Sequence, residues 1–232
     1  MFAAGVAILS AVFQALKIDR MQYSSGALRE GLLYDLLGRI QHRDIREATV
    51  QSLTQRYHVD MDQAQRVEKT AIALANQLVK PWQLCREDID LWLHWAALLH
   101  ETGLVIAHNQ YHKHGAYLVE YSDLAGFSLL DQCFLAILVR CHRRKFRRLL
   151  VETLPEDRQE KAIRLAILLR LSVLLHRNRS QAEDPEIRIS ATDQSIQLKF
   201  PDGWLEEHPL TLADLDQERK HLKPVSFKLE CS

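Results

Sequence analysis

Apolar residues at helical spacing run through most of the chain and predict a mainly α-helical protein. The first such segment, Phe2–Leu16, predicts a buried helix, and a second helix is predicted over Ala27–Leu37, after the tight turn that Gly26 permits. A short extended piece is expected between them at Arg20–Tyr23. The first segment is too short to cross a bilayer and lacks the basic start of a signal peptide. Because natural amino termini are more often polar, we expect the chain to be the tail of a longer protein.

The middle of the chain predicts a bundle of amphipathic helices. One apolar stripe consists of Val67, Ala71, Leu74 and Leu78, which follow one another at helical spacing. Ser128 can begin another helix in the manner of a capping box. Helices are expected at His42–Tyr57, between a cap at Asp60 and a stop at Pro81, and at Asp88–Leu99, His114–Tyr121, Leu129–Lys145 and Ala162–Leu175.

Alternation of apolar and polar residues replaces this pattern in the last quarter of the chain. Ile187–Phe200 alternates across a turn at 192–194 and predicts a β-hairpin. Thr211–Leu222 predicts a short helix, and Val225–Leu229 alternates as a last strand. The expected fold is therefore a helical body followed by a small α+β part, with Arg177–Pro185 as the linker.

Composition adds few constraints. With 47% hydrophobic and 26% charged residues and a formal net charge of zero, the chain has the make-up of an ordinary globular protein. Nothing global points to nucleic acid, so any anion binding must come from local patches. The four cysteines contain no Cys-x-x-Cys pair, which disfavours zinc ribbons and disulfide frameworks and fits a cytoplasmic location.

A dense basic run ends the helix predicted at Leu129–Lys145. Arg140–Arg148 holds six lysines or arginines in nine residues, more than the helix dipole can use, and their mutual repulsion favours a bound anion. Phe146 is the one aromatic residue of the run, so a base-free polyanion fits better than RNA. The alternative is a solvated basic face.

Histidines concentrate in one short segment, where His100 is followed directly by Glu101. This pair lies where HD-type metal phosphohydrolases carry a His-Asp pair. Their two other ligand positions fall on Gln63, a weak ligand, and on Val173, which has no ligand atom. We therefore expect no bound metal. His100 and Glu101 are the only catalytic candidates, and a buried structural pair is the simpler interpretation of them.

Longer strings point to a known family. SSGALREG and YHKHGAYL…SDLAGF are the most specific, and AAGVAILSAVF, LLHETGL, LVRCHRRK and FPDGWLEEHPL accompany them. With these strings the chain resembles the exopolyphosphatase / guanosine pentaphosphate phosphohydrolase (Ppx/GppA) family over essentially its whole length. The resemblance is closer to exopolyphosphatase, because HKHGAYL and LVRCHRRK keep histidine and basic positions.

The resemblance implies the end of an actin-like domain at 1–36, an HD-like helical domain at 37–178 and a small α+β domain at 186–232. Family members cleave a terminal phosphoanhydride with Mg²⁺ and a glutamate-activated water in upstream actin-like domains. This chain carries neither the Gly-rich phosphate loops nor that glutamate, so no catalytic residue and no bound cofactor are expected in it. Arg29, at the start of the helix predicted at Ala27–Leu37, can contribute to a phosphate cradle or pair with a carboxylate, and the resemblance matches it to an arginine that faces the phosphate cleft. The density of the basic run and the resemblance together give the predicted phosphate- or polyphosphate-binding residues: Arg29, His112, His114, Arg140, His142, Arg143, Arg144, Lys145, Arg147 and Arg148.

The main prediction is the C-terminal part of a bacterial exopolyphosphatase, which releases terminal orthophosphate from inorganic polyphosphate. This part would bind and channel the polyanion and support a homodimer. The alternatives are the same part of a guanosine pentaphosphate hydrolase, a standalone HD-type metal phosphohydrolase, and a pure dimerisation module. No nucleic-acid partner and no transmembrane span are expected; peripheral membrane association is left open.

Overall fold

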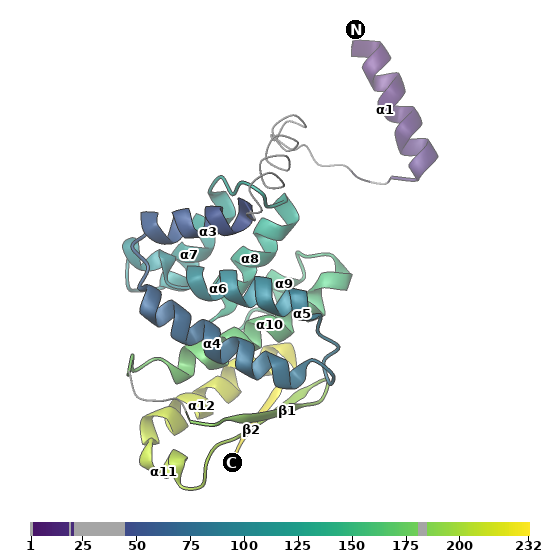
Figure 1. The fold of residues 1–232 in the computed structure, drawn as a ribbon. Helices are drawn as coiled ribbons and strands as arrows, with labels where there is room; N and C mark the ends of the chain where they lie inside the picture. The colour runs from purple at the N-terminus through teal and green to yellow at the C-terminus, as the bar shows by residue number, and fades with distance from the viewer. Residues whose placement is uncertain (1, 19, 21–44, 181–184) are drawn as a thin grey trace. The chain divides into compact units, whose positions relative to one another are not determined.

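The computed structural model describes residues 2–18, 20, 45–180 and 185–232 (Figure 1). The chain divides into two compact units, Met1–His42 and Arg43–Ser232. In the first unit, helix α1 (Phe2–Leu16) has the predicted bounds. The prediction that this helix is buried is wrong for the described chain: Ile8 is 69% and Leu16 is 68% exposed, because no described segment covers them.

Two further predictions for the first unit cannot be compared with the structure. The helix predicted at Ala27–Leu37 lies outside the described residues, and so does most of the extended piece predicted at Arg20–Tyr23. The assignment of 1–36 to an actin-like domain therefore stays a prediction.

The second unit begins with a helical body, as predicted (Figure 1). A π-helical turn, η1 (Ile89–Leu93), leads into α6, and a 3-10 turn, η2 (Thr102–Val105), follows it. The α-helices are α3 (Ile45–Arg56), α4 (Met61–Leu78), α5 (Arg86–Asp88), α6 (His94–Leu99), α7 (Tyr111–Tyr121), α8 (Leu129–Cys141), α9 (Arg148–Val151) and α10 (Glu156–Leu175).

Two helix starts follow directly from the sequence. Asp60 Oδ1 accepts from the Gln63 N–H at 3.0 Å and caps α4, and Ser128 Oγ accepts from the Asp131 N–H at 3.1 Å and caps α8. Each side chain satisfies a backbone donor that the first helical turn leaves free. Both predicted caps are confirmed.

The predicted helix at Leu129–Lys145 is too long, because α8 ends at Cys141. The chain turns there: Arg144 adopts a left-handed backbone with φ of 63°. Arg170, buried in α10, donates to the carbonyls of Cys141 and Arg144, so those carbonyls are satisfied without further helix. The basic run is consequently split by a turn instead of covering one helix face.

A three-stranded sheet follows the helical body, with β1 (Arg188–Ala191), β2 (Ser195–Lys199) and β3 (Lys228–Cys231) in that order. β1 and β2 form the predicted antiparallel hairpin, and β3 pairs parallel to β2. Three helical segments, α11 (Trp204–Glu207), α12 (Pro209–Leu222) and the 3-10 turn η3 (Lys223–Val225), make the crossover that a parallel pair requires.

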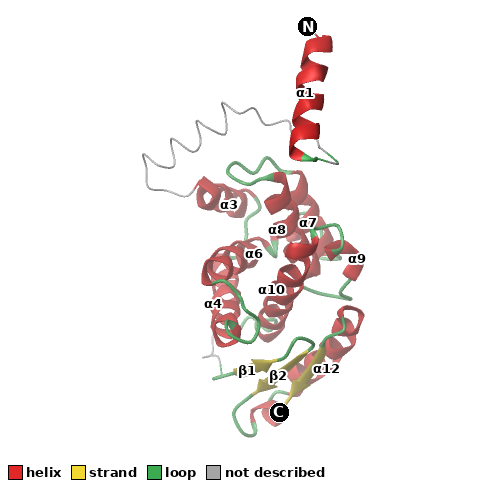
Figure 2. Ribbon diagram, turned by 90° about the vertical axis from the view of Figure 1, so that its right-hand side faces the viewer, coloured by secondary structure: helices red, strands yellow, loops and turns green. Residues whose placement is uncertain are grey.

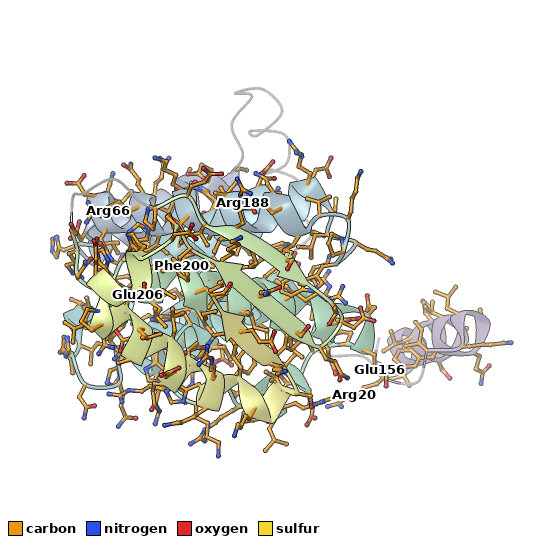
Figure 3. All side chains as sticks on the ribbon, turned by 90° about the horizontal axis from the view of Figure 1, so that it is seen from below. Arg20, Arg66, Glu156, Arg188, Phe200 and Glu206 are labelled. Atoms are coloured by element: carbon orange, nitrogen blue, oxygen red, sulfur yellow. The ribbon has the colours of Figure 1, made fainter. Side chains whose placement is uncertain are left out.

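The sheet and the helical body pack against one another (Figures 2 and 3). Gln77 of α4 donates to Ile187 O at 3.1 Å and accepts from Ile189 N at 3.1 Å, which covers the free edge of β1. Trp82 donates to Thr192 O at 2.9 Å and meets the Phe227 ring edge-on at 5.9 Å. Both parts thus share one core. The predicted division into separate domains at 37–178 and 186–232 stays a prediction.

No helix among the described residues is long and apolar enough to cross a membrane.

Candidate functional site

Two glycines bring the end of α6 against α7. A Cβ added to Gly103 would lie 2.0 Å from the carbonyl oxygen of Tyr111 and 2.4 Å from the backbone nitrogen of Gly115. Only a residue without a side chain allows this approach. As a result His100 and Glu101, which precede Gly103, lie beside the first turn of α7.

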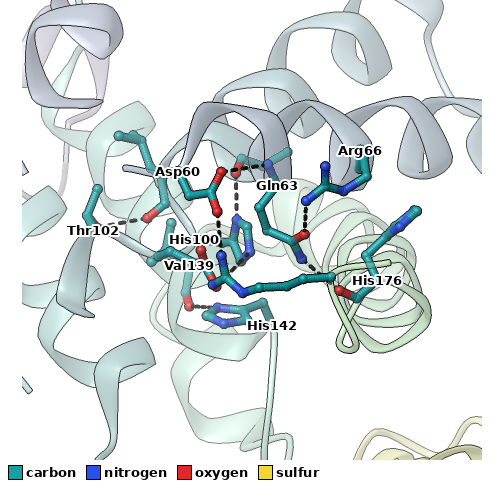
Figure 4. Close-up of polar contacts among 12 residues, drawn as sticks. Asp60, Gln63, Arg66, His100, Thr102, Val139, His142 and His176 are labelled. Atoms are coloured by element: carbon teal, nitrogen blue, oxygen red, sulfur yellow. Dashed lines mark hydrogen bonds and ion pairs between the residues drawn. The ribbon is translucent and has the colours of Figure 1, made fainter. Parts of the chain in front are cut away.

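His100 and His142 form a buried pair at this centre (Figure 4). Their rings are perpendicular, with centroids 5.4 Å apart. The Nδ1–H of His100 donates to Ala97 O and that of His142 to Val139 O, each at 2.6 Å. Burial lowers the pKa of both imidazoles, that of His142 to well below 6.5. Both rings are neutral at pH 7, and each presents an Nε2 lone pair that has no hydrogen-bond partner in the part of the chain that the structure describes.

Glu101 lies near His100, but its direct partner is an arginine. Glu101 Oε1 is 4.0 Å from His100 Nε2 and 2.6 Å from the Arg179 guanidinium. The same guanidinium reaches Asp60 Oδ2 at 2.6 Å, so it bridges the cap of α4 and the end of α6 (Figure 4). The predicted His100–Glu101 pair is therefore a loose contact at 4.0 Å, and the ion partner of the Glu101 carboxylate is Arg179.

The four positions expected for an HD-type metal site do converge. Gln63, Glu101 and Val173 line one cavity, and His100 adjoins Glu101. The Gln63 amide is engaged at both ends, because it donates to His176 O at 2.8 Å and accepts from Arg66 at 2.8 Å. No cluster of three His, Cys, Asp or Glu side chains within the described ranges could hold a metal ion.

The Mg²⁺ that the resemblance implies for full-length enzymes does not fit this centre. Magnesium prefers six oxygen ligands in near-octahedral geometry. The groups present are the two imidazoles, a valine, an amide with both ends occupied and a carboxylate bound to Arg179. No chemical step is therefore derived through a metal here.

A cavity of about 480 Å³ opens beside this centre and is bounded on its other side by α12. Its charged lining consists of five arginines and three carboxylates, a net charge of +2 with the histidines counted as neutral. The arginines are Arg143, Arg144, Arg170, Arg177 and Arg179. The carboxylates are Glu101, Asp214 and Glu218.

Three of these arginines each pair with a carboxylate of the cavity, as Arg177 does with Asp214 at 2.5 Å. The other two have no carboxylate partner in the described part of the chain. Arg143 lies over the Tyr111 ring, 4.4 Å from its centroid, and the Arg144 side chain is exposed. The excess positive charge is thus carried by Arg143 and Arg144.

The predicted phosphate-binding residues are scattered by the turn after α8. His142, Arg143 and Arg144 line the cavity. His112 is buried near His142, and burial together with neighbouring cations, Arg140 foremost, lowers its pKa to about 3. Arg29 lies outside the described residues. The remaining candidates do not line the cavity: His114, Arg140, Lys145, Arg147 and Arg148.

Arg170, Arg177 and Arg179 were not predicted to contribute to this site. Arg177 and Arg179 lie in the stretch interpreted as a linker, where sequence gives no sign of a cavity. The sequence did indicate a structural role for Arg170, because a charged residue that is buried inside the apolar segment Ala162–Leu175 must have a partner. That partner, Glu218, comes from α12 and is not recognisable from sequence.

Two family descriptions match the chain. "Ppx/GppA phosphatase, domain III" matches residues 45–219, and "Ppx/GppA phosphatase family" matches residues 1–40. The first covers the helical body, the β1–β2 hairpin and most of α12, and it ends before β3.

Curated relatives align with nearly the whole chain. The guanosine-5'-triphosphate,3'-diphosphate pyrophosphatase of Pseudoalteromonas translucida is 35% identical over 228 residues, which is 98% of this chain and 46% of that protein. Proteins of the same name from Aeromonas hydrophila and Photobacterium profundum are 38% and 35% identical, over 92% and 98% of this chain and 43% and 45% of their own lengths. This chain therefore spans about half the length of these relatives. Their names do not support the predicted closer likeness to exopolyphosphatase.

Proposed function

This chain belongs to the Ppx/GppA phosphatase family, and we propose that it is the accessory half of a phosphohydrolase acting on guanosine 5'-triphosphate 3'-diphosphate. In this proposal the arginine-lined cavity binds phosphate groups of the substrate. Hydrolysis itself belongs to the half of the relatives that this chain does not span.

The observation that carries the proposal is the uncompensated charge of Arg143 and Arg144. Arg143 is half-buried and Arg144 is exposed, and neither has a carboxylate partner among the described residues, so an anion in the cavity is attracted by both guanidinium groups. Phosphate suits them, because guanidinium donors match its oxygens in paired hydrogen bonds. A nucleotide with phosphates at both its 5' and 3' positions carries more negative charge than is needed to balance the net charge of +2 on the cavity lining.

The geometry at His100 and Glu101 gives no support for catalysis at this centre. A general base must lie within about 2.6–3.2 Å of the group that it deprotonates. Glu101 is held by Arg179 and is 4.0 Å from His100, and both imidazoles are enclosed. We therefore assign this centre a binding role.

Inorganic polyphosphate is the second candidate ligand. Lys145, Arg147 and Arg148 are exposed beyond the cavity, and a long polyanion could follow them outward where a nucleotide could not. Arg148 is partly neutralised by Glu152 at 3.2 Å. The names of the relatives favour the nucleotide.

The test is calorimetric titration of the purified chain with guanosine 5'-triphosphate 3'-diphosphate, inorganic triphosphate and long-chain polyphosphate. We expect binding of the nucleotide that weakens steeply as salt is raised, because several charges are neutralised together. We also expect no release of orthophosphate. Failure to bind any of the three anions would refute the proposal, and preference for the long chain would favour polyphosphate.

A further inference from the structure

At the positions where an HD-type site would hold its metal ligands, the positive charge comes from a side chain, that of Arg179. Arg179 lines the same cavity as Glu101 and Gln63, and it contacts Glu101 and Asp60 at 2.6 Å each. Its charge is felt at the centre, since it helps to lower the pKa of His100. HD-type metal phosphohydrolases place a metal ion against the acidic residue that follows this histidine.

The backbone is shaped to hold this side chain in place. Arg179 follows α10 and has a left-handed φ of 54°, a conformation that glycine and asparagine adopt more readily than arginine does. Its N–H bonds to His176 O at 3.1 Å, which closes the turn after the helix. A strained conformation that persists is a reason to look for function at that residue.

Unsatisfied acceptors gather where His100, Glu101 and His142 lie close together. His100 Nε2, His142 Nε2 and Glu101 Oε2 are all buried and have no hydrogen-bond partner among the described residues. Three acceptors without a donor create a region of negative potential that favours a permanent cation. Arginine meets this need better than histidine, because its guanidinium stays charged.

The guanidinium also keeps donors for a ligand. Arginine has five N–H donors, and the hydrogen bonds of Arg179 to Asp60 and Glu101 occupy only part of them. The side chain is 43% exposed and lines the same cavity as Arg143. Arg143 covers the Tyr111 ring. Burial raises the pKa of Tyr111, and the charges of Arg143 and Arg179 oppose that rise.

We propose that Arg179 is the built-in cation of this centre and that, together with Arg143, it binds a phosphate group of the ligand without any metal ion. The proposal rests on the phosphate-binding function proposed above and names the residue that takes the metal's role. The proposal predicts that Arg179 and Arg143 together bind inorganic diphosphate or the diphosphate group of a nucleotide.

Calorimetric titration of the full chain with inorganic diphosphate tests the proposal, once with a chelator and once with Mg²⁺. Because Mg²⁺ itself complexes diphosphate, we expect binding with the chelator to be at least as tight as binding with Mg²⁺. Arg179→Ala should weaken binding at least tenfold and Arg179→Lys less, because lysine keeps the charge but not the planar set of donors. Arg188→Ala, at a position 75% exposed on β1, is the control (Figure 3) and should leave affinity unchanged.

Asp60→Asn gives a test of opposite sign that does not depend on Arg179→Ala folding. Asparagine can still cap α4, but it no longer neutralises the guanidinium, so diphosphate should bind several-fold more tightly. Unchanged affinity in both Arg179→Ala and Asp60→Asn, with loss in Arg143→Ala, would overturn this inference and spare the proposed function. Binding that the chelator abolishes would also overturn it. No diphosphate binding by either the wild-type chain or Asp60→Asn would overturn this inference, and the proposed function would then be decided by the titration with the nucleotide.

Discussion

Arg170 and Glu218 form a buried, two-point ion pair that joins α10 to α12. The Arg170 Nε lies 2.5 Å from Glu218 Oε1 and its Nη2 lies 2.8 Å from Glu218 Oε2. The same guanidinium donates to the carbonyls of Cys141 and Arg144. One side chain thus holds three segments around the cavity: α10, the turn after α8, and α12.

Removing either residue of this pair should destabilise the fold, because the other residue is left as an uncompensated charge in the core. We expect Glu218→Gln or Arg170→Met to lower the free energy of unfolding by about 3–5 kcal/mol, measured by urea denaturation. The double variant Arg170→Met with Glu218→Leu should lose less than the sum of the single losses, since neither charge is then stranded. Strictly additive losses would mean that the two side chains do not depend on each other.

Gly103 is the second position where a small change should have a large effect. In Gly103→Ala the new Cβ would meet backbone atoms of Tyr111 and Gly115 at 2.0 and 2.4 Å, so α6 and α7 must separate. We expect a loss of about 3 kcal/mol or more in the free energy of unfolding, at or above the usual range for overpacking. Gly5→Ala in α1 is the control, because nothing lies within 4 Å of its added Cβ. The urea midpoint of the Arg43–Ser232 unit should not move in that variant.

Much of the fold was predictable because its signals are local. The caps at Asp60 and Ser128, the apolar stripe of α4 and the β1–β2 hairpin depend on residues a few positions apart, and the structure confirms all of them. The end of α8 was predicted wrongly, because a residue of α10 satisfies its last carbonyls.

The site was predictable only in part. The string from His100 to Arg144 located one wall of the cavity, and Gln63 and Val173, predicted as a weak ligand and as no ligand, line the same cavity. Arg179 could not be foreseen. Its role depends on a left-handed turn and on a carboxylate far away in the chain, and neither leaves a mark in the sequence around it.

His94 should make stability fall as the pH rises above 6.5. Its Nδ1 lies 2.7 Å from Glu68 and its Nε2 lies 2.9 Å from Glu47, and these carboxylates raise its pKa above 6.5 against the effect of burial. A raised pKa in the folded state gives stability that is fully present below pH 6.5 and is lost as pH rises through the raised value. The urea midpoint should therefore drop over that interval in the wild type and stay flat in His94→Gln. An equal drop in both proteins would assign the effect to other groups.

His112 should act in the opposite direction, on the acid side. Its pKa is lowered to about 3, so between pH 6.5 and 3 the unfolded chain binds a proton that the folded chain excludes. Stability should decline as pH falls through this range, and His112→Gln should decline less steeply. The control is His58→Asn, an exposed position with a left-handed φ of 49° that asparagine tolerates. It should follow the wild-type curve.

The charge of the cavity can be removed without touching its ion pairs. Replacing Arg143 and Arg144 together by alanine takes the net charge of the lining from +2 to zero, because five arginines become three against three carboxylates. We expect affinity for inorganic triphosphate to fall at least tenfold, about 1.4 kcal/mol, with a shallower dependence on salt. Lys145→Ala with Arg147→Ala removes the same charge from the exposed run outside the cavity. If that control weakens binding as much as the cavity variant does, the anion follows the exposed run, and the cavity is not its principal site.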